Sequence, residues 1–140
     1  MADHMIRILL VEDDEVDIMN VQRAFRKNNI DNPLVVANNG VEALLILREA
    51  IAKGNDAFKI VILDLNMPKM GGIEFLKQVR ADPVLKPLSV FVMTTLNEES
   101  DKMATYDLNI AGYIVKPLSF DSFVHAISVL KHYWQLRERP

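Results

Sequence analysis

The sequence predicts a three-layer, doubly wound α/β protein in which a parallel sheet of five strands lies between two layers of helices. Short runs of Ile, Val and Leu alternate along the chain with longer segments of helical periodicity, and Gly, Pro and Asn separate the two. The short runs are apolar at successive positions, which is typical of strands covered on both faces. Because each parallel pairing requires a right-handed crossover, helices are expected on both sides of the sheet.

The predicted strands are the runs in which aliphatic residues follow one another with little polar interruption. In chain order they are Ile6–Val11, Leu34–Ala37, Ile60–Leu63, Ser89–Met93 and Tyr113–Val115. Helices are predicted where apolar residues recur three and four positions apart. A helix over Glu98–Asp107 has only Met103, Ala104 and Tyr106 in support. The clearer apolar stripes are Ile18, Val21, Ala24 and Phe25; Val41, Leu44, Leu45, Leu47 and Ile51; Ile73, Leu76 and Val79; and Phe120, Phe123, Val124, Ile127 and Leu130.

The composition excludes several classes of protein. The 140 residues fit one domain, and 16 Lys and Arg against 19 Asp and Glu give a net charge of −3 without the clustered cations of a nucleic-acid surface. The absence of Cys excludes disulfides, thiolate metal sites and a Cys nucleophile. The longest apolar runs, Ile8–Val11 and Ile60–Leu63, are far shorter than the roughly 20 residues of a membrane-spanning helix. No secretory signal is evident, so a cytoplasmic protein is expected.

Polar side chains follow four of the five predicted strands. Glu12–Asp14 follow the first strand, Asp64 the third, Thr94 the fourth and Lys116 the fifth. The carboxyl ends of parallel strands share one edge of the sheet, where doubly wound proteins bind their ligands, so these groups are expected to converge. Each has a structural alternative. The acids near the first strand can cap a helix, Asp64 can open a turn, and Thr94 and Lys116 can be an ordinary strand-end residue and a solvated charge.

Taken together, these groups indicate phosphoryl chemistry. Clustered carboxylates repel one another unless a cation joins them, and Mg²⁺ prefers oxygen ligands. An Asp carboxylate can act as a nucleophile and form an aspartyl phosphate. A Lys ammonium and a Thr hydroxyl can then bind the phosphoryl oxygens.

At this point the sequence resembles the receiver domain of two-component response regulators. The resemblance covers about residues 6–130, and Thr94 and Lys116 follow Asp64 at spacings of 94 − 64 = 30 and 116 − 94 = 22 residues. The matching motifs are Ile8–Asp14 (ILLVEDD), Asp64–Pro68 (DLNMP) with Gly71 and Gly72, Met93–Thr95 (MTT) and Gly112–Pro117 (GYIVKP).

The resemblance implies a flavodoxin-like sheet with strand order 2-1-3-4-5 and a receiver domain over residues 6–131. Residues 132–140 are set apart as an aromatic tail, whose Trp134 either extends the stripe of the last helix or contacts a partner. Residues 1–5 are left out of the domain, as either a native start or an expression remnant. Since no output domain follows, a single-domain regulator that signals by docking is expected.

The resemblance also implies roles for individual residues. Asp64 is the expected phosphoacceptor, which takes the phosphoryl group from a phosphohistidine of a sensor histidine kinase. Lys116 is expected to ion-pair with Asp64 and later with the phosphoryl group. Mg²⁺ is expected to be held by Asp13, Asp64, the backbone carbonyl of Asn66 and, through water, Glu12.

Two side chains are expected to move when the domain is phosphorylated. Thr94 is expected to bond a phosphoryl oxygen, and Tyr113 to turn into the space that Thr94 leaves, unless Tyr113 is an ordinary core aromatic. The Lys116–Pro117 bond is expected to be cis. Because the phosphoryl group adds close to two negative charges, the surface of the fourth helix, fifth strand and fifth helix is expected to change. That surface or the aromatic tail can serve either a homodimer or a contact with another partner, and the sequence leaves the oligomeric state open.

A narrower resemblance is to the small regulators paired with phytochrome-type histidine kinases. It depends on three features: the segment Ile51–Lys59, the Met93–Thr95 motif and the tail. The segment Ile51–Lys59 either lengthens the second helix and its loop or is an ordinary surface loop.

Two other functions compete with that of a phosphorylated regulator. A phosphatase with an Asp nucleophile needs a second acid where Asn66 stands, so the chain is not expected to be an enzyme. Receiver-like domains that act without phosphorylation usually lack the Asp or the Lys, and both are present here.

Overall fold

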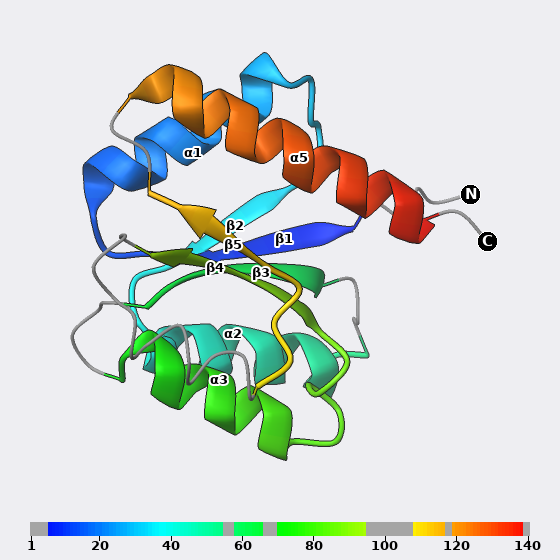
Figure 1. Cartoon of the computed structure of the whole chain (residues 1–140). Helices are drawn as coiled ribbons and strands as arrows, with labels where there is room; N and C mark the ends of the chain where they lie inside the picture. The colour runs from blue at the N-terminus through cyan, green and yellow to red at the C-terminus, as the bar shows by residue number, and fades with distance from the viewer. Residues whose placement is uncertain (1–5, 55–57, 66–69, 95–107, 117–118, 139–140) are drawn as a thin grey trace.

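The described part of the chain comprises residues 6–54, 58–65, 70–94, 108–116 and 119–138 of a computed structural model. Its helices and strands alternate along the chain (Figure 1). The helix predicted over Glu98–Asp107 lies outside the described residues. The elements are β1 (Arg7–Val11), α1 (Glu15–Lys27), β2 (Leu34–Ala37), α2 (Gly40–Ala52), β3 (Phe58–Asp64), α3 (Gly72–Ala81), β4 (Ser89–Thr94), β5 (Gly112–Val115) and α5 (Phe120–Glu138).

The predicted fold class is confirmed. The five strands form one parallel sheet in the order β2-β1-β3-β4-β5. In Figure 1, α1 and α5 cover one face of the sheet, and α2 and α3 cover the other. The strand register aligns the carboxyl ends, because Val11 of β1 lies opposite Leu63 of β3, and Asp64 lies opposite Met93 of β4.

The alternation of side chains along the strands divides the core into two layers. On β1, Leu9 and Val11 join the cluster beneath α2 and α3, whereas Ile8 and Leu10 join the cluster beneath α1 and α5. All four side chains are buried. Strands that are apolar at successive positions therefore face two hydrophobic layers, as the sequence predicts.

Helices α1 and α2 begin at polar caps. Asp14 is the N-cap of α1, and its carboxylate accepts hydrogen bonds from the backbone N–H groups of Val16 and Asp17. Asn39 caps α2 by accepting the N–H of Glu42 at 2.8 Å. Such caps satisfy donors that the first turn of a helix leaves unpaired. Asp14 therefore fixes the point at which the chain turns from β1 into α1.

Helix α5 is bound to α1 by hydrogen bonds and to β4 by an aromatic contact. The side-chain amide of Asn28, at the end of α1, donates to the carbonyl of Val124, and Lys131 donates to the carbonyl of Asn28 at 2.6 Å. The ring of Tyr133 meets Phe91 edge-on, with centroids 5.0 Å apart. The backbone of α5 continues through Glu138, so residues 132–138 of the predicted tail are helical.

Within the described ranges, no helix is both long and apolar enough to cross a membrane.

Two details of the sequence prediction are wrong around α2. Val41, Leu45 and Ile51 are exposed, although the apolar stripe assigned them to the core. Three of the five buried residues of α2 are small. The residues of α2 that are buried are Gly40, Ala43, Leu44, Leu47 and Ala50. In addition, α2 ends at Ala52 and β3 begins at Phe58, so Phe58 and Lys59 extend a strand rather than a loop.

Candidate functional site

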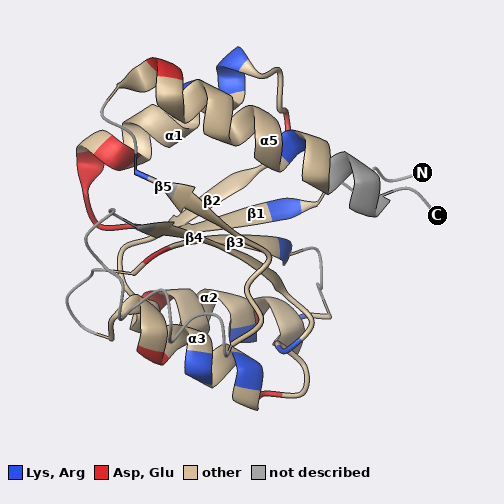
Figure 2. Cartoon of the chain, viewed as in Figure 1, with Lys and Arg blue, Asp and Glu red and all other residues tan. Residues whose placement is uncertain are grey.

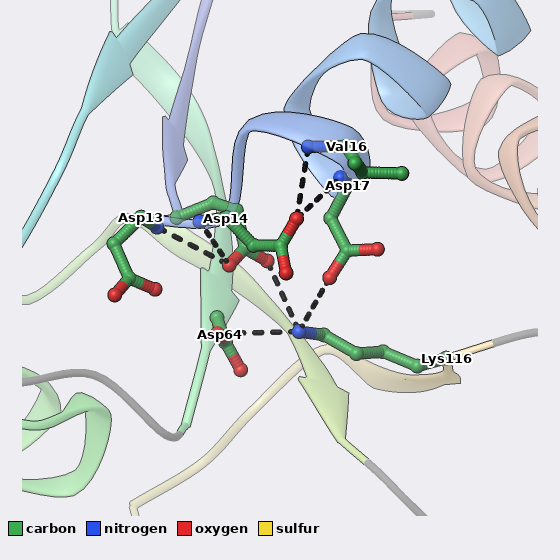
Figure 3. A network of polar contacts seen from close by, with 7 residues as sticks. Asp13, Asp14, Val16, Asp17, Asp64 and Lys116 are labelled. Atoms are coloured by element: carbon green, nitrogen blue, oxygen red, sulfur yellow. Dashed lines mark hydrogen bonds and ion pairs between the residues drawn. The ribbon is translucent and has the colours of Figure 1, made fainter.

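The carboxyl ends of β1, β3 and β5 bring together polar residues that are far apart in the sequence. Glu12 follows β1, Asp64 is the last residue of β3, and Lys116 follows β5 (Figure 3). Figure 2 shows acidic residues along the connection from β1 into the first turn of α1. The convergence predicted from the strand ends is therefore present for these residues.

Three carboxylates form the centre of the site. Oxygen atoms of Glu12, Asp13 and Asp64 all lie within 4.8 Å of one another. Glu12 is fully buried and Asp64 is 2% exposed, whereas Asp13 is exposed. Backbone N–H groups of Asp13 and Asp14 donate to Glu12 Oε2 at 3.2 and 3.1 Å, which holds this side chain in place.

The ammonium of Lys116 neutralises part of this negative charge. Its Nζ atom lies 3.3 Å from Glu12 Oε1, 3.3 Å from Asp64 Oδ2 and 2.9 Å from Asp17 Oδ2. Burial by itself would lower the pKa of Lys116. The hydrogen bond to Asp17 and the charges of Asp64 and Glu12 outweigh burial, so the pKa is raised above its ordinary value. Lys116 is therefore a fixed positive charge at this rim.

Glu12 is an acid that tends to keep its proton. Burial, together with the neighbouring Asp64 carboxylate, raises the pKa of Glu12 from 4.5 to about 8, although Lys116 and the N–H of Asp14 act in the opposite direction. Among the described residues, Glu12 Oε1 has no hydrogen-bond partner in spite of its burial. A buried carboxylate oxygen in this situation fits either a proton or a cation.

The donor set fits a hard divalent cation. Glu12, Asp13 and Asp64 offer only carboxylate oxygens, which suit Mg²⁺ or Mn²⁺. A cation would also satisfy Glu12 Oε1 and reduce the repulsion between the three acids. Asn66, whose carbonyl the sequence analysis adds to these ligands, lies outside the described residues.

The remaining predicted residues are placed only in part. Thr94 ends β4 opposite Val115 of β5, one residue beyond the position paired with Asp64, but its side chain is not described. Tyr113 lies on β5, is half-buried and packs against the cluster on the α2 and α3 side. Pro117, and with it the predicted cis bond, lies outside the described residues.

Two residues at the site were missed by the sequence analysis. Asp17 accepts the hydrogen bond of Lys116, yet in the sequence it is only one of several acids in the first turn of α1. Gly72 begins α3 so close to β3 that a Cβ there would lie 2.6 Å from the carbonyl oxygen of Asp64. Gly72 belongs to the motif that follows Asp64–Pro68, but the motif gives no sign of this contact.

A doubly wound sheet with carboxylates and one lysine at its carboxyl rim defines a receiver-type α/β domain. The chain belongs to the response regulator receiver domain family, whose family model matches residues 8–128.

Two relatives of similar length match nearly the whole chain. The chain is 33% identical over 133 residues to the probable methanogenesis regulatory protein FilR2 of Methanothrix harundinacea, covering 95% of this chain and 86% of FilR2. It is 31% identical over 128 residues to response regulator Rcp1 of Synechocystis sp., covering 91% of this chain and 87% of Rcp1.

Solved structures give the same assignment. The phosphorylated cyanobacterial phytochrome response regulator RcpA superposes with a TM-score of 0.84 at 30% identity, covering 96% of this chain and 97% of RcpA. The Mn²⁺-bound form of Rcp1 superposes with a TM-score of 0.80 at 30% identity, covering 91% of this chain and 93% of Rcp1. The chain is thus similar to phytochrome response regulators in both sequence and fold.

Proposed function

We propose that this protein is a response regulator that accepts a phosphoryl group on Asp64 from a sensor histidine kinase in a Mg²⁺-dependent reaction. The observation that carries the proposal is the position of Asp64, which lies beside the acids Glu12 and Asp13 and 3.3 Å from the ammonium of Lys116. A carboxylate in this setting has both a place for a cation and a fixed positive charge for a phosphoryl group.

The transfer is a substitution at phosphorus. A carboxylate oxygen of Asp64 forms the new bond to phosphorus while the bond from phosphorus to the kinase imidazole nitrogen breaks. The imidazole leaves as a neutral ring when its other nitrogen carries a proton, so no further reactant is needed. The transferred group brings negative charge beside Asp64, and Lys116 is close enough to neutralise part of it.

Mg²⁺ would be held by Asp13 and Asp64, by Glu12 through water, and by the carbonyl of Asn66. Its chemical contribution is to offset the charge of the carboxylates and of the incoming phosphoryl group. The backbone donors that fix Glu12 Oε2 leave Oε1 3.3 Å from the ammonium of Lys116. Glu12 therefore contributes an oriented acceptor, and Lys116 contributes the charge that stays with the phosphoryl group.

The switch uses β5 as its moving element. Lys116 directly follows β5, so a shift of the ammonium from Asp64 toward the phosphoryl group acts on this strand. In the proposal, Thr94 bonds a phosphoryl oxygen and Tyr113 turns inward from β5. Phosphorylation then favours one of two arrangements of the β5 and α5 surface, through which a second copy or a target docks.

We further propose that the partner kinase is of the phytochrome type and that the protein works in the cytoplasm. The support is the similarity to Rcp1 and RcpA, of which the latter is described as a phytochrome response regulator. The protein acts as a switch that carries one phosphoryl group, not as an enzyme that turns over phosphate esters. Asn66 supports this point, because its amide cannot protonate a leaving group.

The proposal is tested by incubating the protein with acetyl phosphate and Mg²⁺ and measuring its intact mass. One added phosphoryl group per chain is expected, and none with EDTA or in Asp64→Asn. The matched control is Asp31→Asn, because Asp31 is an exposed acid that precedes β2 and so lies at the opposite edge of the sheet. Full modification of Asp64→Asn, or steady hydrolysis of a phosphomonoester by the parent, would refute the proposal.

A further inference from the structure

The first turn of α1 carries a carboxylate to which the proposed function gives no role. Asp17 Oδ2 accepts a hydrogen bond from Lys116 Nζ at 2.9 Å, which is shorter than the 3.3 Å ion pairs of this ammonium with Glu12 and Asp64. The side chains of Asp17 and Lys116 are only 22% and 20% exposed. A charge-assisted hydrogen bond that is partly shielded from water is stronger than an ion pair on an open surface.

The backbone of α1 holds Asp17 in this position. Asp14 Oδ1 accepts the N–H of Asp17 at 3.1 Å, and the N–H of Asp14 donates to Glu12 Oε2 at 3.1 Å. With the contacts of Lys116 to Asp17 and Glu12, these bonds close a ring of four residues (Figure 3). The position of Asp17 relative to Lys116 is therefore set by the cap of the helix and does not depend on a flexible side chain alone.

Asp17 differs from the other two partners of Lys116 in its relation to the metal site. The carboxylates that lie within 4.8 Å of one another belong to Glu12, Asp13 and Asp64. Glu12 and Asp64 would therefore be shared between the cation and Lys116, and two positive charges on the same carboxylates repel each other. Among the described residues, Asp17 is not part of this group, and its carboxylate pairs with the ammonium of Lys116.

We propose that Asp17 is a positioning residue, which keeps Lys116 beside Asp64 when Mg²⁺ occupies the acidic cluster. This inference rests on the proposed function, because it requires the metal site. An ammonium has three hydrogens, and one of them is directed to Asp17 in the structure. When Glu12 and Asp64 turn to the cation, the other hydrogens become available to the phosphoryl group, while the bond to Asp17 keeps the nitrogen near Asp64 until that group arrives.

Loss of the Asp17 charge changes the competition for the shared carboxylates. In Asp17→Asn, Lys116 depends on Glu12 and Asp64 alone, so it binds them more strongly and opposes the cation. Mg²⁺ affinity should therefore fall, and the fall should be transmitted through Lys116. If the loss of net charge alone lowered the Mg²⁺ affinity, the fall would also occur without Lys116.

The experiment is a calorimetric titration with Mg²⁺ alone, without a phosphodonor. We expect the dissociation constant of Asp17→Asn to rise roughly threefold to tenfold, as for a pair of directly coupled residues. Glu15→Gln is the matched control, because Glu15 is exposed in the same turn of α1 and loses the same charge. Its dissociation constant should change by less than about twofold, the size of a screened surface effect.

The same titrations in a Lys116→Ala background distinguish positioning from charge. There, Asp17→Asn should weaken binding no more than Glu15→Gln does, and in the parent background Asp17→Glu should restore most of the affinity. Lysine ammonium NMR of the Mg²⁺-saturated protein gives a second readout. The Lys116 signal should be protected from exchange in the parent and lost in Asp17→Asn.

Two results would overturn the inference. One is an Asp17→Asn effect no larger than that of Glu15→Gln, and the other is an effect of equal size with and without Lys116. If the parent itself bound no Mg²⁺, the proposed metal site would be wrong, and the proposed function would fail with the inference. If the parent bound Mg²⁺ normally, only the role of Asp17 would be in question.

Discussion

The ammonium of Lys116 lies 3.3 Å from the carboxylate of Asp64, although the strands that carry these residues are not neighbours. β4 lies between β3 and β5 in the sheet, so the lysine side chain reaches across the carboxyl end of β4. This contact joins the central strand that carries the proposed phosphoacceptor to β5 at the edge of the described sheet. Through this contact, a change of charge at Asp64 would act on Lys116, the residue that follows β5.

Replacing Lys116 with Ala should destabilise the metal-free protein. The change leaves the buried carboxylate of Asp64 without its cation and removes the ammonium beside Glu12, which we expect to lower the free energy of unfolding by about 2–4 kcal/mol. Lys53→Ala is the control, because Lys53 pairs with Glu49 at 3.6 Å on an open helix surface. That variant should lose less than about 0.5 kcal/mol in chemical denaturation. Equal losses in the two variants would contradict the account.

The same variant should separate phosphorylation from signalling. Lys116→Ala should retain Mg²⁺ binding, because the three carboxylates of the acidic cluster remain. Its phosphorylated form should bind the partner no more tightly than its unphosphorylated form, since the link from Asp64 to β5 is lost. Affinity for the partner kinase or target, measured with and without phosphodonor, checks this expectation. A phosphorylation-dependent gain in affinity equal to that of the parent would refute the role of Lys116.

Glu12 should make the metal-free protein less stable as the pH rises. Its pKa is about 8 in the folded protein against 4.5 ordinarily, so the folded state binds more protons than the unfolded state between these values. The Glu12 contribution is therefore complete below pH 4.5 and is lost as the pH rises through about 8. The slope should be at most about 1.4 kcal/mol per pH unit.

Denaturation in EDTA at a series of pH values measures this slope. Glu12→Gln should flatten it, because the amide does not titrate. Saturating Mg²⁺ should also flatten it, since the cation replaces the proton in stabilising the carboxylate. An unchanged slope in Glu12→Gln would assign the pH dependence to other groups.

Gly72→Ala should disturb the strand end that carries Asp64. A Cβ at position 72 would lie 2.6 Å from both the carbonyl oxygen of Asp64 and the Cα atom of Leu65, so backbone must shift. We expect a loss of about 1–3 kcal/mol and weaker Mg²⁺ binding, although Ala is ordinarily the better helix residue. In the control Gly112→Ala, the nearest atoms of Phe91 are 3.5 Å away. Chemical denaturation and Mg²⁺ titration measure the two effects. Equal losses of stability and of Mg²⁺ affinity in Gly72→Ala and Gly112→Ala would argue against the close contact of position 72 with Asp64.

Arg80 should stabilise the segments that lead into β4 and β5, at the end of the sheet opposite the site. From α3, its guanidinium donates to the carbonyls of Lys86 and Leu88 before β4 and of Leu108 and Asn109 before β5, at 2.7–3.0 Å. An ammonium cannot reproduce this planar set of donors, so Arg80→Lys should lose about 2–3 kcal/mol. Arg48→Lys on the exposed face of α2 should change stability by less than about 0.5 kcal/mol. A loss in Arg80→Lys no greater than in that control would contradict the anchoring role.

The strand ends could be predicted from the sequence because a parallel sheet leaves few arrangements. Once the apolar runs are assigned to parallel strands, Glu12, Asp64 and Lys116 must lie at the carboxyl end of the sheet. The inward face of α2 was not predictable in the same way. Leu44 and Leu45 are adjacent and both apolar, yet Leu44 is buried and Leu45 is 64% exposed. Periodicity cannot choose a face when apolar residues surround the helix.

Asp17 and Gly72 could not be assigned from the sequence for a different reason. An acid in the first turn of a helix is favourable through the helix dipole alone, so Asp17 gave no sign of an ion pair 99 residues away. The contact of Gly72 with Asp64 depends on how closely α3 approaches the end of β3. Both the Asp17–Lys116 hydrogen bond and the close approach of Gly72 to Asp64 depend on how the helices pack against the sheet.

The central claim is that the phosphoryl group is carried by Asp64, and chemical mapping tests it most directly. Borohydride reduction of the phosphorylated protein converts an acyl phosphate into the corresponding alcohol, and peptide mass spectrometry then locates the changed residue. The account predicts homoserine at position 64 and at no other acidic position. Homoserine at position 13 or 17, or phosphorylated protein in which Asp64 is unchanged, would contradict it.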